Sequence, residues 1–185
     1  MARIALVHCH PVEGSFTTAV RDTMAQAITE RAGVVDIIDL YAEDVDPIRP
    51  DREHIARHRA LLETADALVL VYPTWWSAQP AMLQGWVEAV LPREVTRGRP
   101  MPRVRRILAV TSHGSPKWLN AMEGEAGKRL VTRYLRRAAH RRCRTEWIAL
   151  YGMDRIGDAE RTAHLERARS RAARLVDRST GSFSR

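Results

Sequence analysis

The sequence predicts an α/β fold in which a doubly wound parallel sheet is covered by helices on both faces. Five short runs of the chain are apolar throughout and rich in β-branched residues, a pattern typical of strands that are buried on both sides. These runs alternate with segments in which apolar residues recur at helical spacing. Together the two patterns indicate parallel strands joined by crossover helices.

The expected strands and helices follow one another along the chain without an internal repeat. The strands are residues 4–7, 34–38, 67–72, 107–111 and 147–151. The helices are residues 20–28, 55–64, 83–91, 130–138 and 165–176, the last with Asp158 as its N-cap. We expect Gly33 to end the first helix, because glycine readily adopts the left-handed conformation found at helix C-termini. Trp86 lies on the apolar stripe of the third helix, which indicates a place in the core.

Length and composition predict one folded domain. With 185 residues, 45% of them hydrophobic and 28% charged, the chain can bury a sizeable core and is not disordered. We place the domain at residues 1–178 and expect the small, polar residues 179–185 to form a flexible tail. No apolar run reaches the roughly 18 residues of a membrane span and no signal peptide is recognisable, so a cytoplasmic protein is expected. Cys9 and Cys143 lack metal-site spacing, so we expect no metal and two reduced, structural thiols.

The charge balance favours anionic partners. Basic residues outnumber acidic ones by 30 to 22, a net charge of +8 that is carried almost entirely by arginine. Residues 128–144 contain seven arginines and no carboxylate, which would suit a basic nucleic-acid-binding module. However, these arginines alternate with Tyr134, Leu135 and Ala138 at helical spacing. That alternation favours the solvated face of an amphipathic helix, and we expect no nucleic-acid partner.

The loop after the first strand has the composition of a phosphate site. Five strands with such a loop after the first favour the flavodoxin-like strand order 2-1-3-4-5, in which ligands bind beyond the carboxyl ends of the strands. Residues 8–18 carry the hydroxyls of Ser15, Thr17 and Thr18 and lead into a helix whose first amides can bind an anion. Nucleoside-triphosphate and dinucleotide fingerprints are absent. An ordinary N-cap at Ser15 and a surface position for His10 are the alternative interpretation.

The loop after the third strand carries two adjacent tryptophans. Trp75 and Trp76 cannot both point into one core, and Pro73 and Pro80 stiffen the backbone on either side. An aromatic wall at the end of a buried strand suits a flat ring ligand. A subunit interface would use the same residues, and both interpretations hold when a site is built at a dimer interface.

Three blocks of the sequence resemble the flavodoxin-like NAD(P)H quinone oxidoreductases, which include small bacterial quinone reductases and the ancillary reductase of potassium efflux systems. The blocks are residues 10–17, 72–86 and 111–114, and the resemblance extends from Arg3 to about Arg155. It implies a homodimer that binds FMN or FAD and passes a hydride from NAD(P)H to a small aromatic acceptor such as a quinone, by a ping-pong scheme. A flavodoxin-type electron carrier is an alternative, although such carriers do not need the double-tryptophan pocket.

The resemblance also assigns residues to the site. The flavin phosphate and ribityl chain would lie on the first block, the ring along the second, and the polar edge of the ring against the third. The implied cofactor-binding residues are His10, Ser15, Phe16, Thr17, Pro73, Thr74, Trp75, Trp76, Thr111, Ser112, His113 and Gly114. Animal members carry a tyrosine and a histidine after this point, whereas residues 115–120 of this chain contain no tyrosine. His113 and Lys117 are therefore the expected catalytic groups, placed to stabilise negative charge on the reduced flavin.

Overall fold

The computed structural model describes residues 1–91 and 98–180, with side chains up to residue 177, and it confirms the predicted sheet. Five parallel strands lie in the order β2-β1-β3-β4-β5. They are β1 (Arg3–His8), β2 (Val34–Asp39), β3 (Ala67–Thr74), β4 (Arg106–His113) and β5 (Arg144–Tyr151). The three middle strands are buried almost throughout, which is why their sequences are continuously apolar.

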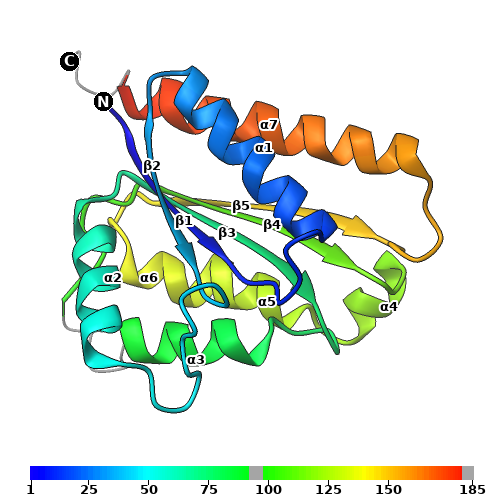
Figure 1. Ribbon diagram of the computed structural model, residues 1–185, viewed down its shortest axis with the longest axis horizontal. Coiled ribbons are helices and arrows are strands. Elements are labelled where there is room, and N and C mark those ends of the chain that lie inside the picture. Colours follow the sequence, from blue (N-terminus) through cyan, green and yellow to red (C-terminus); the bar gives the residue numbers. More distant parts are fainter. Residues whose placement is uncertain (92–97, 181–185) are drawn as a thin grey trace.

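Helices cover both faces of the sheet, as predicted (Figure 1). One face carries α1 (Phe16–Glu30) and the long α7 (Asp158–Thr180), which pack side by side. The other face carries α2 (Arg52–Thr64), α3 (Ala81–Val90) and a segment made of α5 (Ala126–Arg129), the π-helical η2 (Leu130–Leu135) and α6 (Arg136–Ala138). The short α4 (Lys117–Met122) lies beyond the carboxyl end of β4. Helices α4 and α5 are too short to show a helical period, so the sequence pattern does not predict them.

Each face of the sheet has its own hydrophobic core, because successive residues of a strand point to opposite sides. In β1, Ile4 and Leu6 pack beneath α1 and α7, whereas Ala5 and Val7 belong to the core on the other face. Trp86 of α3 is fully buried in that second core, as predicted. No helix within the described ranges is long and apolar enough to cross a membrane.

The two cysteines are free and buried, which agrees with the prediction of structural thiols. Burial raises the pKa of Cys9 to about 12 and the pKa of Cys143 to about 11. Both side chains are therefore protonated at neutral pH.

The end of α1 differs from the prediction. The left-handed residue after this helix is Ala32, with a φ of 55°, and not Gly33. Gly33 is needed for a different reason: a Cβ there would lie 2.8 Å from Cγ2 of Ile28 and 2.9 Å from Cγ2 of Val176. The missing side chain lets α1 and α7 approach each other closely at this point.

Two further details of the helices, at Tyr134 and at Asp158, differ from the prediction. Tyr134, predicted on the same apolar stripe as Leu135, is 63% exposed, whereas Leu135 is buried as predicted. Both lie in the π-helical segment, whose period differs from that of an α-helix. At α7, Asp158 is the first helical residue rather than the N-cap. This helix continues to Thr180, past the domain end predicted at residue 178, and residues 181–185 of the predicted tail lie outside the described residues.

Candidate functional site

A cavity of about 640 Å³ opens at the carboxyl edge of the sheet, where the loops after β1, β3 and β4 meet. Its walls consist of His10, Ser15, Phe16, Thr17, Pro73, Thr74, Trp75, Trp76, Ser77, Ser112, Gly114, Ser115, Leu119, Glu123, Met153 and Asp154. Every predicted cofactor-binding residue lines this cavity except Thr111 and His113. Three sequence blocks that lie far apart along the chain thus form one site, at the place where the strand order reverses.

The first wall is the N-terminal turn of α1. Ser15 is the N-cap of this helix, and its Oγ accepts a hydrogen bond from the Thr18 amide at 3.1 Å. The amides of Phe16 and Thr17 make no hydrogen bond within the described part of the chain, and they lie at the positive end of the helix dipole. Ser15 therefore caps the helix and still leaves two donors free for an anion.

The second wall comes from the loop after β3. Trp75 and Ala78 exchange two backbone hydrogen bonds of 3.0 Å, which close a turn with Trp76 and Ser77 at its tip. Both tip residues are left-handed, with φ of 49° and 59°, a conformation that is unfavourable for a side chain as bulky as tryptophan. This turn holds Trp76 fully exposed at the cavity rim, while the Trp75 ring lies 6.1 Å from the ring of His10. Neither tryptophan serves the core.

A hydrogen-bonded chain of side chains runs behind the cavity wall. The amide nitrogen of Asn120 donates to Ser115 Oγ at 2.8 Å, so the Asn120 oxygen faces Nδ1 of His113, also at 2.8 Å. Because this oxygen can only accept, Nδ1 carries the proton and Nε2 is an acceptor in the neutral ring. The Thr74 hydroxyl then donates to Nε2 at 3.3 Å and accepts from Thr111 at 2.8 Å. Of these groups, only Thr74 and Ser115 belong to residues that line the cavity.

The structure brings neither predicted catalytic group into the cavity wall. His113 is buried behind the wall, where its ring stacks on Tyr151 with centroids 4.5 Å apart. Burial lowers the pKa of His113, and the hydrogen bond to Asn120 and the charge of Glu125 oppose this only in part. The ring is therefore neutral at pH 7. Lys117 is exposed on α4 and is not among the lining residues.

Several residues that line the cavity were not predicted from the sequence. Met153 and Asp154 follow β5, and their position was predictable in principle because all carboxyl ends of a parallel sheet lie at one edge. Leu119 and Glu123 come from α4 and the residue after it, which the sequence pattern does not reveal as a helix. Contact between these segments is close: a Cβ on Gly114 would lie 3.0 Å from Oδ2 of Asp154.

The described arginines do not line this cavity. No lysine or arginine is found among the residues that line it. A smaller cavity of about 230 Å³, at the amino ends of β4 and β5, includes Arg106, Arg144, Arg171 and Arg174 but no aromatic ring. An anionic ligand of the main cavity therefore depends on the helix terminus rather than on ion pairs with described side chains.

Comparisons with known proteins agree with this geometry. The family model described as flavodoxin-like fold matches residues 2–176. An uncharacterized NAD(P)H oxidoreductase of Escherichia coli (strain K12), YcaK, is 34% identical over 102 residues, which are 48% of this chain and 52% of that protein. The chain thus spans about half the length of the curated relatives it matches.

Solved structures share the fold over nearly the whole chain. The NAD(P)H:quinone oxidoreductase from Methanothermobacter marburgensis has a TM-score of 0.77 and 22% identity, covering 94% of this chain and 96% of that one. The FMN-dependent NADH-azoreductase from Bacillus anthracis str. Ames Ancestor, in complex with FMN, has a TM-score of 0.73 and 14% identity, covering 95% and 100%. Strand order, the position of the cavity and the family match over residues 2–176 lead to the same conclusion: the chain belongs to the family of proteins with the flavodoxin-like fold.

Proposed function

We propose that the chain is an NAD(P)H-dependent oxidoreductase that holds a flavin in the 640 Å³ cavity and reduces a quinone-like acceptor. One observation carries this proposal. Two free amides at the N-terminus of α1 and an aromatic, hydroxyl-lined wall at the end of β3 border the same cavity. One end of the cavity suits a phosphate and the other a flat ring. The names of the relatives support the same class of enzyme.

The residues present fit FMN. The amides of Phe16 and Thr17 would hold its phosphate, and Pro73, Thr74 and Trp75 would lie along its ring. The cavity volume falls within the roughly 300–1,000 Å³ of small-molecule sites. The azoreductase neighbour in complex with FMN supports this choice, and FAD is the alternative that direct identification of the cofactor tests.

The chain's own residues would orient the cofactor and polarise its surroundings. A bound flavin supplies the hydride chemistry between NAD(P)H and the acceptor. Thr74 presents a hydroxyl oxygen to the cavity, and His113 directs the O–H of that hydroxyl away from it. His113 would therefore be a positioning residue that acts through Thr74. Backbone amides, rather than His113, would stabilise negative charge on the bound cofactor.

We propose a ping-pong order, because the two substrates would use the same face of the flavin. NAD(P)H and the acceptor both need to lie flat against the flavin ring, and with Pro73, Thr74 and Trp75 along one face of that ring only the opposite face would be open to them. The oxidised nicotinamide would leave before the acceptor enters. Parallel lines in double-reciprocal plots at several acceptor concentrations are expected, and intersecting lines would contradict this order. The cytoplasm, where NAD(P)H is available, is the proposed compartment.

A second copy of the chain would cover the rim of the cavity. Trp118 and Met122, one helical turn apart on α4, are 64% and 77% exposed. The end of α4 is tied to the Trp76 turn, because the Ser77 hydroxyl donates a hydrogen bond to Glu123 directly after α4. Exposed aromatic and methionine side chains next to a ligand cavity are typical of interfaces. We propose a homodimer through this surface, to be checked by sedimentation of the wild type and of the Trp118→Glu variant.

The function is tested by purification followed by three measurements. We expect a yellow protein, release of FMN on denaturation, and oxidation of NADH or NADPH that depends on an added benzoquinone. Flavin without quinone-dependent turnover would favour the electron carrier. Absence of flavin after reconstitution, together with salt-sensitive retention on DNA, would favour the basic binding module and would contradict the proposal.

A further inference from the structure

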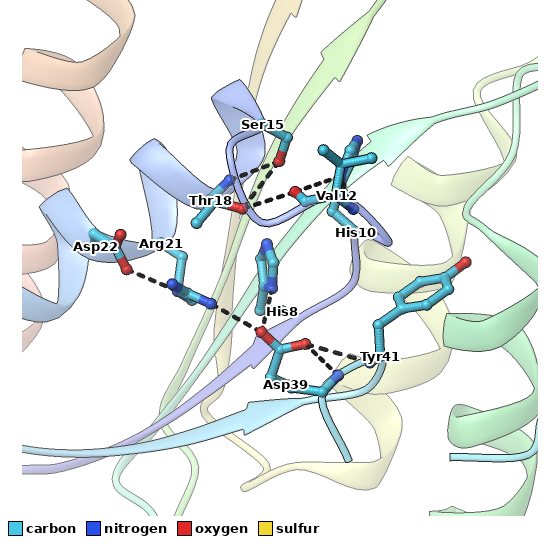
Figure 2. Close-up of polar contacts among 10 residues, drawn as sticks. His8, His10, Val12, Ser15, Thr18, Arg21, Asp22, Asp39 and Tyr41 are labelled. Carbon is cyan, nitrogen blue, oxygen red and sulfur yellow. Dashed lines mark hydrogen bonds and ion pairs between the residues drawn. The ribbon is translucent and has the colours of Figure 1, made fainter. Parts of the chain in front are cut away.

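His8 is a buried residue beneath the first turn of α1 that the proposed function does not use. It is the last residue of β1, it is 1% exposed, and it is not among the residues that line the cavity. Figure 2 shows its ring standing between Asp39 at the end of β2 and the loop that leads into α1. A histidine in this place can influence whatever binds at the helix terminus above it.

Asp39 determines which nitrogen of the His8 ring carries the proton. Its Oδ2 lies 2.8 Å from Nδ1 of His8 and 2.8 Å from Nη1 of Arg21, and its Oδ1 accepts from the amides of Tyr41 and Ala42. Partial burial raises the pKa of Asp39, but the Ala42 amide, His8 and Arg21 outweigh it and the pKa lies below its ordinary value. Since Asp39 is a carboxylate that can only accept, Nδ1 of His8 is the donor.

The other ring nitrogen is left without a partner. Nε2 of His8 is buried and makes no hydrogen bond within the described part of the chain. In Figure 2 it is turned toward the first turn of α1, the same turn in which the amides of Phe16 and Thr17 are free. Buried polar atoms in folded proteins nearly always have a partner. An unpartnered buried nitrogen and two unpartnered amides at one helix terminus point together to a ligand.

The charges around His8 favour a second proton only when an anion is present. Arg21 of α1, His10 of the loop and the positive end of α1 itself disfavour a charged ring, while Asp39 favours it and Asp22 offsets part of the charge of Arg21. Without a ligand, burial keeps the pKa of His8 below its ordinary value. A phosphate monoester brings about −1.5 to −2 charges to the helix terminus and reverses this balance.

We propose that His8 is a positioning residue for a phosphate monoester bound at the N-terminus of α1, and that Nε2 takes up a proton from solvent when the phosphate binds. The inference rests on the proposed function, because the phosphate of FMN is a ligand of this class. It adds a proton-linked preference for FMN over riboflavin, which has the same ring but no phosphate. No lysine or arginine lines the cavity, so this buried imidazole would add a positive charge that the lining residues of those types do not supply.

The test is a pH titration of the histidine side chains by NMR in the wild-type protein, so that no variant has to fold. His8 is followed alone and with inorganic phosphate, FMN or riboflavin, and the amide signals of Phe16 and Thr17 report binding. We expect phosphate and FMN to raise the pKa of His8 by about one pH unit or more, and riboflavin to leave it unchanged. His58 is the matched internal control, because it is also buried beside a carboxylate, Glu43, but on the other face of the sheet. Its titration should not respond to any of these ligands.

A second measurement uses His8→Gln, which retains a donor for Asp39 but cannot gain a proton. At pH 6 we expect this variant to bind FMN about tenfold more weakly than the wild type and to bind riboflavin equally well. The inference is overturned if FMN shifts the amide signals while His8 titrates as before, and in that case the proposed function stands. If FMN does not bind but inorganic phosphate raises the pKa of His8, the proposed function fails and the inference stands. If no ligand shifts the amide signals, both fail.

Discussion

The Thr74 hydroxyl links the cavity wall to the buried ring of His113, with Oγ1 3.3 Å from Nε2. Asn120 of α4 lies 2.8 Å from the other ring nitrogen, Nδ1, and so fixes the orientation of the His113 ring. Through this ring, α4 also orients the Thr74 hydroxyl at the cavity. A substitution at His113 can therefore alter the cavity without changing any atom that lines it.

Replacing His113 by alanine should slow flavin reduction. The substitution removes the acceptor that directs the Thr74 O–H, and we expect the rate of reduction by NAD(P)H to fall about tenfold in a rapid-mixing experiment. Thr74→Val should have a similar effect, and the double variant should be no slower than either single variant, because both changes break the same link. An unchanged rate in His113→Ala would show that His113 does not act through the Thr74 hydroxyl.

Trp75 and Trp76 should control flavin retention. The double alanine variant removes the aromatic wall, and we expect it to lose most of its flavin during purification, measured as flavin released per chain. Tyr134→Ala is the matched control, because Tyr134 is also an exposed aromatic residue but does not line the cavity. Wild-type flavin content in the double variant would show that the tryptophans face another partner.

Ala32 and Gly33 offer a paired test of the packing between α1 and α7. Gly33→Ala places a methyl group against Ile28 and Val176, and we expect the free energy of unfolding to fall by about 1–3 kcal/mol. Ala32→Gly removes a left-handed alanine and should leave stability unchanged or raise it by up to about 1 kcal/mol. Urea unfolding of the two variants checks both values, and the opposite order of stabilities would contradict the assignment.

His164 should make the fold sensitive to acid. This residue of α7 is buried against Phe16, and burial, with a contribution from Arg167, lowers the pKa of His164 to about 4. The unfolded chain binds a proton at this position near pH 6.5, so the stabilising contribution is complete above that pH and is lost as the pH falls toward 4. Between pH 6.5 and 4, we expect the free energy of unfolding of His164→Leu to decrease by up to about 3 kcal/mol less than that of the wild type. Urea titrations at several pH values measure the slope, which should be steeper in the wild type than in the variant.

The sheet could be predicted because its evidence is local and repeated. Runs such as residues 4–7 and 67–72 are apolar without interruption only because both faces of the central strands are covered. The cap at Ser15 was equally accessible, since the capping oxygen and the amide that it binds are three residues apart. The carboxyl-edge position of the cavity then follows from the topology.

The depth of His113 could not be predicted in the same way. It depends on Asn120, which reaches back from α4, and on Tyr151 at the end of β5, and neither contact leaves a periodic signal in the sequence. The turn at Trp76 was hidden for a related reason, because a tryptophan in a left-handed conformation contradicts its own local preference. In both cases the surrounding fold, and not the residue, determines the geometry.

Cys9 follows β1 directly and is the neighbour of His10 in the cavity wall, yet its sulfur is buried and protonated. Quinones are electrophiles that add to thiolates, and peroxide formed when a reduced flavin meets oxygen oxidises them. With Cys143 also buried, the proposed function would expose neither thiol of the folded chain to these reagents. Alkylation of either cysteine would then require the surrounding core to open, so alkylated cysteines would identify molecules that have unfolded.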